Sequence, residues 1–162
     1  GDEGAGTIVF EEYPLHALVH EAIKVSDTIA KGKNINIIED CQKNICALIN
    51  PALMIQALSN LLGNAVKYSE PDTIVNLSVK EVEQEIKIFV TDQGHGISSQ
   101  HLERLFERFY RVDTARSRKM GGTGLGLSIV KHITQLHGGQ VTVESKLGQG
   151  STFIIHLPRL LT

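Results

Sequence analysis

Three short segments of this chain carry residues whose types and spacing could bind a nucleotide. Residues 60–68 place two carboxamides four positions apart, and residues 92–97 put a carboxylate ahead of two glycines. Residues 121–128 form a glycine-rich run ahead of an apolar stretch. Together they could supply an oxygen ligand for a metal ion, an acceptor for a base and a cradle for phosphates. Any one of them alone would be weak evidence, so the prediction depends on all three.

The first segment carries Asn60 and Asn64, which share one face of a helix because they are four residues apart. An amide oxygen is a hard ligand suited to Mg²⁺, which takes few protein groups and keeps phosphates and water. Lys67 and Tyr68 continue that face, and a lysine can meet a phosphate as a point charge. In isolation, the same residues also fit a solvated polar helix face.

The second segment begins with Asp92, which follows the apolar run 86–90 and is therefore expected at a strand end. A carboxylate there can accept the exocyclic amine of adenine, a donor that guanine lacks at that ring position. Gly94 and Gly96 permit positive φ and a close backbone approach. An ordinary turn after a strand would use the same residues. We expect His95 to be a solvent-facing loop residue rather than a metal ligand.

The third segment, residues 122–126, leads directly into an apolar-periodic helix predicted over 124–137. Backbone amides at the start of a helix make an anion site, and glycine allows a phosphate to come close. The segment is not a P-loop, because it lacks the Gly-Lys-Ser/Thr ending. Its glycine spacing also differs from the dinucleotide fingerprint, which needs a preceding strand. It therefore predicts a site for a triphosphate.

The elements that position these segments follow from hydrophobic periodicity. Helices are predicted over 13–31, from Pro51 onward and over 124–137. Strands are predicted over 34–38, 45–49, 73–80, 85–92, 140–145 and 151–157, with the last two pairs forming hairpins. Residues 98–110 fit short helical turns, and the polar, basic run 111–122 predicts a mobile loop. The expected fold is α+β, a two-layer sandwich of one mixed sheet covered on one face by three helices.

The composition limits what the chain can do. Its 162 residues, 41% hydrophobic and 21% charged, suit one globular domain over 8–162, with 1–7 as a flexible leader or cloning scar. A net charge of −2 gives no reason to expect nucleic acid, and no apolar run reaches the length of a membrane span. Cys41 and Cys46 are predicted to be free thiols rather than a disulfide or metal pair.

The order and spacing of the three segments resemble the ATP-binding catalytic domain of bacterial sensor histidine kinases, over about residues 35–158. Residues 105–113 are similar to the phenylalanine box of that family, and residues 148–152 to its last glycine segment. The resemblance implies that ATP and Mg²⁺ bind, and that the γ-phosphoryl group passes to a histidine on a dimerisation domain absent from this chain. It further implies two-component signalling through a response regulator, a cytoplasmic domain, and a full-length protein anchored in the bacterial inner or plasma membrane.

The same resemblance assigns roles to individual residues. Asn64 is expected to ligate magnesium, and Lys67 and Arg111 to act on the phosphates during catalysis. Asn60 stands where related ATPases often have a water-activating Glu, and an amide cannot act as a base at neutral pH. The remaining nucleotide contacts are expected from Tyr68, Asp92, Gly94, Gly96, Ile97, Gly122, Thr123, Gly124, Leu125, Gly126, Leu127 and Thr152.

Two other classes of the same superfamily stay open: an ATP-driven conformational clamp and an anti-sigma-type serine kinase. Asn60 and the basic run before Gly121 favour a histidine kinase over the clamp, and the phenylalanine box favours it over the serine kinase. His20 lacks the residues that normally follow a phosphoacceptor, and His16 with His20 lacks a third zinc ligand. The chain alone is therefore predicted to be a monomer that barely hydrolyses ATP and does not phosphorylate itself.

Overall fold

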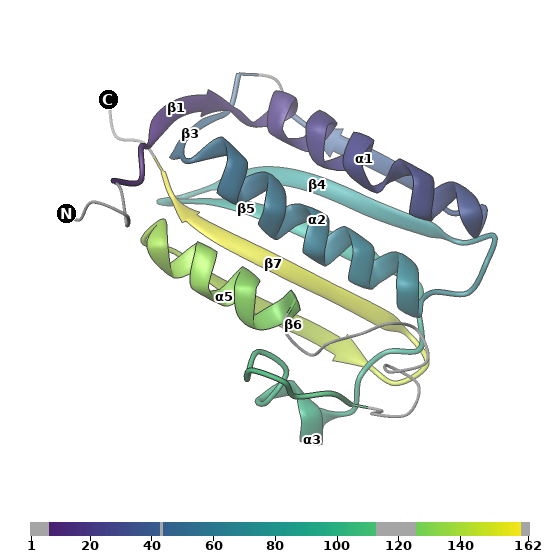
Figure 1. The fold of residues 1–162 in the computed structure, drawn as a ribbon. Helices are drawn as coiled ribbons and strands as arrows, with labels where there is room; N and C mark the ends of the chain where they lie inside the picture. Colours follow the sequence, from purple (N-terminus) through teal and green to yellow (C-terminus); the bar gives the residue numbers. More distant parts are fainter. Residues whose placement is uncertain (1–6, 43, 113–125, 160–162) are drawn as a thin grey trace.

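Five strands form one mixed sheet in the order β2-β4-β5-β7-β6 (Figure 1). The structure is a computed structural model that describes residues 7–42, 44–112 and 126–159. β2 runs parallel to β4, and the other neighbouring strands are antiparallel. The strands are β2 (Asn36–Cys41), β4 (Ile74–Val82), β5 (Glu85–Asp92), β6 (Gln140–Lys146) and β7 (Gly150–Pro158).

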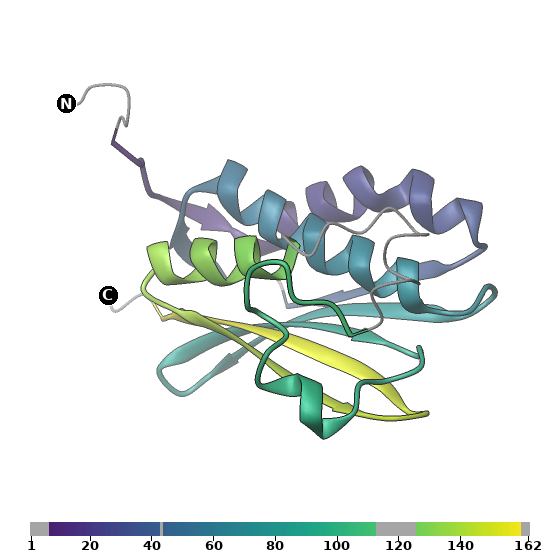
Figure 2. The ribbon, with the colours of Figure 1, turned by 60° about the horizontal axis from the view of Figure 1, so that its bottom comes forward.

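Three helices cover one face of this sheet, as Figure 2 shows. They are α1 (Leu15–Gly32), α2 (Pro51–Tyr68) and α5 (Gly126–Leu136). α2 lies in the middle of the layer and contacts both of the other helices. The predicted two-layer α+β sandwich is therefore confirmed.

The core lies between the two layers because each element presents one apolar side. In β5, Ile86, Ile88 and Val90 alternate with more exposed residues and are fully buried. The buried stripe of α2 consists of Met54, Ala57, Leu58, Leu61, Leu62, Ala65 and Val66. Leu53, on the same helix, is only half-buried but packs against the core. Burial of each large apolar side chain contributes about 1.5–3 kcal/mol, so this stripe holds α2 to the sheet.

A second, smaller sheet differs from the prediction. β1 (Glu11–Pro14) pairs antiparallel with β3 (Cys46–Ile49), so residues 45–49 do not lie at an edge of the main sheet. The predicted first helix included Tyr13, which belongs to β1. Four residues are too few to show a strand period, and this pairing depends on the fold rather than on local sequence.

The segment after β5 forms short helical turns, as predicted, and these turns pack against the sheet. α3 (Ser99–Leu102) is followed by further turns, and Phe106 packs edge-on against Phe153 with ring centroids 6.2 Å apart. Most of the predicted mobile loop, 111–122, lies outside the described residues. Within the described part of the chain, no helix is both long and apolar enough to span a bilayer. Cys41 and Cys46 are free thiols, as predicted.

Candidate nucleotide site

The carboxamide face of α2 meets the first residue of α5. Asn60 and Asn64 are both half-buried on α2, and Asn60 Nδ2 donates to the carbonyl oxygen of Gly126 at 3.3 Å. This bond brings the first and third predicted segments together, because Gly126 begins α5. Leu127 follows on α5 and packs against the core. The predicted contacts Gly122, Thr123, Gly124 and Leu125 lie outside the described residues.

Asp92, the last residue of β5, is buried on the helix-covered side of the sheet. Its Oδ1 accepts hydrogen bonds from the backbone N–H of Gly94 at 2.8 Å and of Ser151 at 3.3 Å. Burial raises the pKa of the Asp92 carboxyl above its ordinary value, while these two backbone N–H groups act to lower it. A buried carboxylate that keeps its place in spite of this cost is a functional-site candidate.

The loop after Asp92 is held against the turn between β6 and β7. Gly96 has φ +76°, and a Cβ on it would overlap the carbonyl of Lys146. The backbone N–H of Ile97 donates to Ser145 Oγ at 2.8 Å, and Ser145 in turn contacts Ser151 Oγ at 2.8 Å. The backbone of Gly96 and Ile97 is therefore fixed against the end of β6.

Gly94 joins this loop to the end of α2. A Cβ built on Gly94 would lie 2.7 Å from the carbonyl oxygen of Tyr68 and 3.0 Å from Asp92 Oδ1. Only a glycine allows this approach, so the last turn of α2, with Lys67 and Tyr68, lies beside Asp92. Both of these side chains are half-buried. The first and second predicted segments thus meet at the same place.

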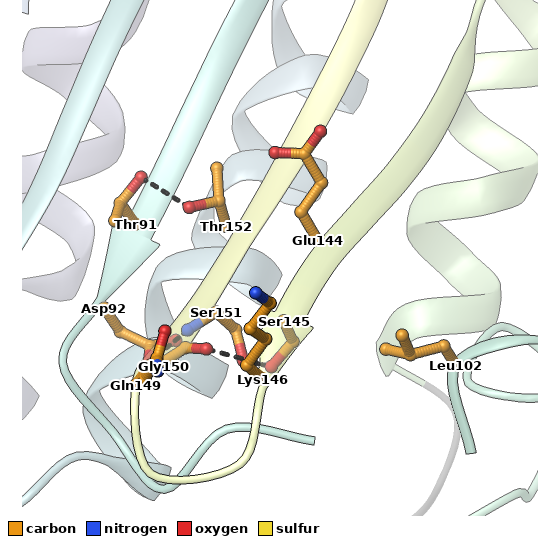
Figure 3. A pocket seen from close by; sticks show the side chains of 10 residues that line it. All are labelled: Thr91, Asp92, Leu102, Glu144, Ser145, Lys146, Gln149, Gly150, Ser151 and Thr152. Atoms are coloured by element: carbon orange, nitrogen blue, oxygen red, sulfur yellow. Dashed lines mark hydrogen bonds between the residues drawn. The ribbon is translucent and has the colours of Figure 1, made fainter. Parts of the chain in front are cut away.

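Thr152 does not join this group. Thr91 and Thr152 are paired across β5 and β7, and their hydroxyls lie 3.1 Å apart (Figure 3). Because side chains alternate along a strand, these two lie on the face away from the helices, whereas Asp92 and Ser151 lie on the covered face. Thr152 therefore lies on the opposite face from Asp92, and the backbone N–H that bonds to Asp92 is that of Ser151. Only the register reveals this, because a one-residue shift exchanges the two faces.

A pocket of about 420 Å³ lies where β5 and β6 end and β7 begins (Figure 3). Its lining residues are Thr91, Asp92, Leu102, Glu144, Ser145, Lys146, Gln149, Gly150, Ser151 and Thr152. Neither Asn60 nor Asn64 lines it. It shares Asp92 and Ser151 with the predicted nucleotide site, but not the carboxamides of α2.

Arg111 follows a cluster of polar and aromatic side chains at the end of the predicted phenylalanine box. Arg104 makes a two-point ion pair with Glu107, at 3.0 and 3.3 Å, and its guanidinium lies 4.5 Å from the ring centre of Tyr110. His101 Nδ1 is hydrogen-bonded to the Tyr110 hydroxyl. Arg111 itself is half-buried and begins the stretch that leads to residues 113–125.

The three histidines considered as metal ligands lie on α1 and in the loop after β5. His95 is partly exposed, as predicted, and its Nε2 lies 3.2 Å from Glu70 Oε1. His16 and His20 are exposed on α1. No group of three or more His, Cys, Asp or Glu side chains among the described residues could hold a metal ion.

Comparisons with known proteins agree on one family. Residues 49–161 match the model described as histidine kinase-, DNA gyrase B- and HSP90-like ATPase. The chain is 44% identical over 144 residues to the sensor-like histidine kinase SenX3 of Mycobacterium tuberculosis, covering 89% of this chain and 35% of SenX3. It is 47% identical over 106 residues to the sensor protein SrrB of Staphylococcus aureus, covering 65% of this chain and 18% of SrrB.

Solved structures of similar proteins share the fold. The mycobacterial sensor histidine kinase MprB superposes with a TM-score of 0.80 at 26% identity, covering 95% of this chain and all of that one. Full-length ShkA in complex with AMPPNP gives a TM-score of 0.83 at 28% identity, covering 98% of this chain and 33% of that one. The present chain thus spans about a third of the length of SenX3 and of ShkA.

Proposed function

The chain belongs to the histidine kinase-, DNA gyrase B- and HSP90-like ATPase family, and we propose from this premise that it binds Mg-ATP and donates the γ-phosphoryl group to a histidine on another domain. Its relatives SenX3 and SrrB are named as sensor proteins, and it represents the catalytic ATP-binding domain of a sensor histidine kinase. The ShkA relative holds AMPPNP, an adenine nucleotide analogue, which supports an adenine nucleotide as ligand. The proposed catalytic and ATP-binding domain covers residues 8–162.

The observation that carries this proposal is the buried carboxylate of Asp92 beside the last turn of α2. Its hydrogen bonds to Gly94 and Ser151 both fall on Oδ1, so among the described residues Oδ2 is the oxygen left to accept a ligand donor. The exocyclic amine of adenine is such a donor. Gly94, Gly96, Ile97, Tyr68 and Leu127 are proposed to line the base and ribose around it. The burial cost of Asp92 is then explained by specificity for adenine.

The donor set of α2 fits a magnesium ion held mainly by phosphates. Asn64 offers one amide oxygen, and Mg²⁺ normally takes one or two protein oxygens with phosphate and water for the rest. When bound, the ion would neutralise charge on the triphosphate. Asn60, one turn earlier, is tied to Gly126 and cannot act as a base, so the site is proposed to protect ATP from water.

The remaining chemistry is proposed to come from cationic and backbone groups around the triphosphate. Lys67 and Arg111 are proposed to contribute positive charge, and Gly126, at the start of α5, to offer a backbone N–H donor. Gly122, Thr123, Gly124 and Leu125, which lie outside the described residues, stay proposed phosphate contacts on the sequence alone. In the transfer, a nitrogen of the acceptor histidine forms a bond to the γ-phosphorus. The bond from that phosphorus to the β–γ bridging oxygen breaks, and ADP leaves. Positioning and charge neutralisation supply most of the catalysis.

The wider setting is proposed from the relatives. The acceptor histidine would lie on a dimerisation domain of the full-length protein, which would pass the phosphoryl group to a response regulator. The full-length protein would be anchored in the bacterial inner or plasma membrane, with this domain in the cytoplasm. The isolated domain would be a monomer without affinity for nucleic acid. No specific observation favours the clamp or the anti-sigma-type serine kinase as a second function.

Calorimetric titration with Mg-ADP and Mg-GDP tests the ligand, and labelled ATP tests the reaction. We expect binding of Mg-ADP in clear preference to Mg-GDP. With γ-labelled ATP, the chain alone should take up no label, whereas a matching dimerisation domain added in trans should become labelled. Acid-labile label on this chain alone, lost in His20→Gln, would place the acceptor on α1 instead. Equal binding of both nucleotides would contradict the role of Asp92.

A further inference from the structure

Lys33 connects the end of α1 to the end of α2, and we propose that it is a positioning residue for the nucleotide site. It is the C-cap residue of α1 and is half-buried. The proposal rests on the proposed function, because the site that Lys33 positions is the one between α2 and Asp92. It assigns to Lys33 no contact with the nucleotide.

The ammonium group of Lys33 is hydrogen-bonded to three backbone carbonyls at the end of α2. Nζ donates to Val66 O at 2.9 Å, to Lys67 O at 2.8 Å and to Ser69 O at 2.8 Å. The last carbonyls of a helix have no partner within the helix and carry partial negative charge. A lysine has three N–H donors and one positive charge, so this single group bonds three acceptors at once. Val66 O also accepts from the backbone N–H of Ser69 at 3.4 Å.

Two of these carbonyls, those of Lys67 and Ser69, lie on either side of the Tyr68 carbonyl, which contacts the loop after Asp92. Tyr68 lies between Lys67 and Ser69, and the Tyr68 carbonyl oxygen is the atom against which Gly94 packs. Gly94 N–H in turn donates to Asp92 Oδ1 at 2.8 Å. A shift of the last turn of α2 would therefore move Gly94 and change the setting of the Asp92 carboxylate.

The backbone of Lys33 is itself anchored, so the ammonium is held at a defined place. Lys33 O accepts from Asp72 N at 3.2 Å, in the turn that follows α2. The neighbouring Asn34, with φ +54°, donates from Nδ2 to Asp72 Oδ1 at 2.6 Å. The turn after α1 and the turn after α2 are thus joined through backbone and side chains. A residue anchored in this way can set the position of α2 rather than follow it.

The experiment compares Lys33→Met with Lys31→Met. Methionine keeps the length of the side chain but removes its charge and donors. Lys31 lies at the same helix end, and its side chain makes an exposed ion pair with Asp27 at 2.9 Å as its one interaction among the described residues. We expect Lys33→Met to weaken Mg-ADP binding by about three- to thirtyfold, as for positions that act on a site through another element. Lys31→Met should bind like wild type. An unchanged affinity in a folded Lys33→Met chain would overturn the proposal.

Two further measurements separate positioning from general stability. Amide exchange of Gly94 in the nucleotide-free chain should be faster in Lys33→Met than in Lys31→Met, although both are folded. In Lys33→Ala, added ethylammonium chloride should restore binding, whereas sodium chloride at the same ionic strength should not. Failure of both the exchange and the rescue effects would show a structural role only.

The outcomes also separate this proposal from the proposed function. If wild type does not bind Mg-ADP, the proposed function fails, and Lys33 is then judged on the exchange of Gly94 alone. If Lys33→Met does not fold, Lys33→Gln, which keeps two N–H donors without charge, replaces it in every measurement. Wild-type exchange and wild-type affinity in Lys33→Gln would then overturn the assignment.

Discussion

Gly94 and the carbonyl oxygen of Tyr68 are so close that a Cβ on Gly94 would lie 2.7 Å from that oxygen. The contact joins a loop at the end of β5 to the last turn of α2. Backbone cannot move aside as a flexible side chain can. The relative position of Asp92 and α2 therefore depends on the absence of a side chain at one residue.

The substitution Gly94→Ala should weaken both the fold and the nucleotide site. Overpacking of this kind costs about 1–3 kcal/mol, and relief of the clash would move Asp92 away from α2. Urea unfolding and Mg-ADP titration measure the two effects. Gly32→Ala is the matched control, because a Cβ at Gly32 would meet nothing within 4 Å. Equal stability and affinity in the two variants would show that the loop adapts freely.

Asp92→Asn should separate stability from binding, with a defined pH dependence. Because burial raises the folded-state pKa of Asp92, the folded chain binds this proton more readily than the unfolded chain. The contribution of Asp92 to the free energy of unfolding thus falls as pH rises from the ordinary Asp pKa through the raised pKa. Above the raised pKa, the full cost of burying the charged carboxylate is present. The variant lacks this penalty and keeps an Oδ1 acceptor for Gly94 and Ser151.

We therefore expect the free energy of unfolding of Asp92→Asn, relative to wild type, to rise as pH increases from the ordinary Asp pKa through the raised pKa, as measured by urea unfolding over a pH series. Binding of Mg-ADP at neutral pH should nevertheless fall about tenfold or more, because the charged acceptor for adenine is lost. Asp27→Asn, which removes a half-buried carboxylate of α1 that pairs with Lys31, serves as control. A relative stability that declines with rising pH would contradict the expected direction.

Asn64→Ala should reduce the magnesium dependence of binding. With Mg²⁺ present, we expect ATP affinity to fall about tenfold, whereas affinity in excess chelator should match wild type. Asn76→Ala, an exposed residue of β4, is the control. A loss of affinity that is equal with and without the metal would assign Asn64 to the nucleotide rather than to the ion.

Asn50→Ala should destabilise the chain without changing the nucleotide site. Asn50 Oδ1 caps α2 by accepting from Leu53 N at 3.0 Å, and Nδ2 donates to Val9 O at 2.9 Å. Loss of an N-cap costs about 0.5–2 kcal/mol, and Asn50→Asp, which keeps the acceptor, should cost less. Tyr68 lies about 25 Å along the helix, so Mg-ADP affinity should stay at the wild-type value. A drop in affinity would show that α2 transmits disturbances along its length.

The main sheet and its three helices could be predicted because their signals are local. The start of α2 is marked by Pro51, and its length by an apolar stripe. In β5, apolar residues alternate within a few consecutive positions. The pairing of β1 with β3 could not be predicted, because Glu11–Pro14 shows no alternation of apolar and polar residues and its partner strand is far along the chain.

The side-chain groups of the candidate site could be predicted from the sequence, whereas its backbone groups could not. Asp92 and Asn64 are recognisable from residue type and from the end of a strand or the face of a helix. The N–H of Ser151 and the carbonyls held by Lys33 leave no pattern in the sequence, since any residue has them. Thr152 and Ser151 differ only in register, which the hairpin alone does not reveal.

The pairing of β5 with β7 also has a consequence for a ribosome that is still making this chain. β4 and β5 are consecutive and can form a hairpin as soon as both have emerged. Asp92 then lacks one of its two backbone donors, because Ser151 lies 59 residues further on. The hairpin of β6 and β7 must be synthesised and close that long loop before the carboxylate is held. In the nascent chain, the Asp92 carboxylate therefore gains its second backbone donor only after β7 has emerged from the ribosome and paired with β5.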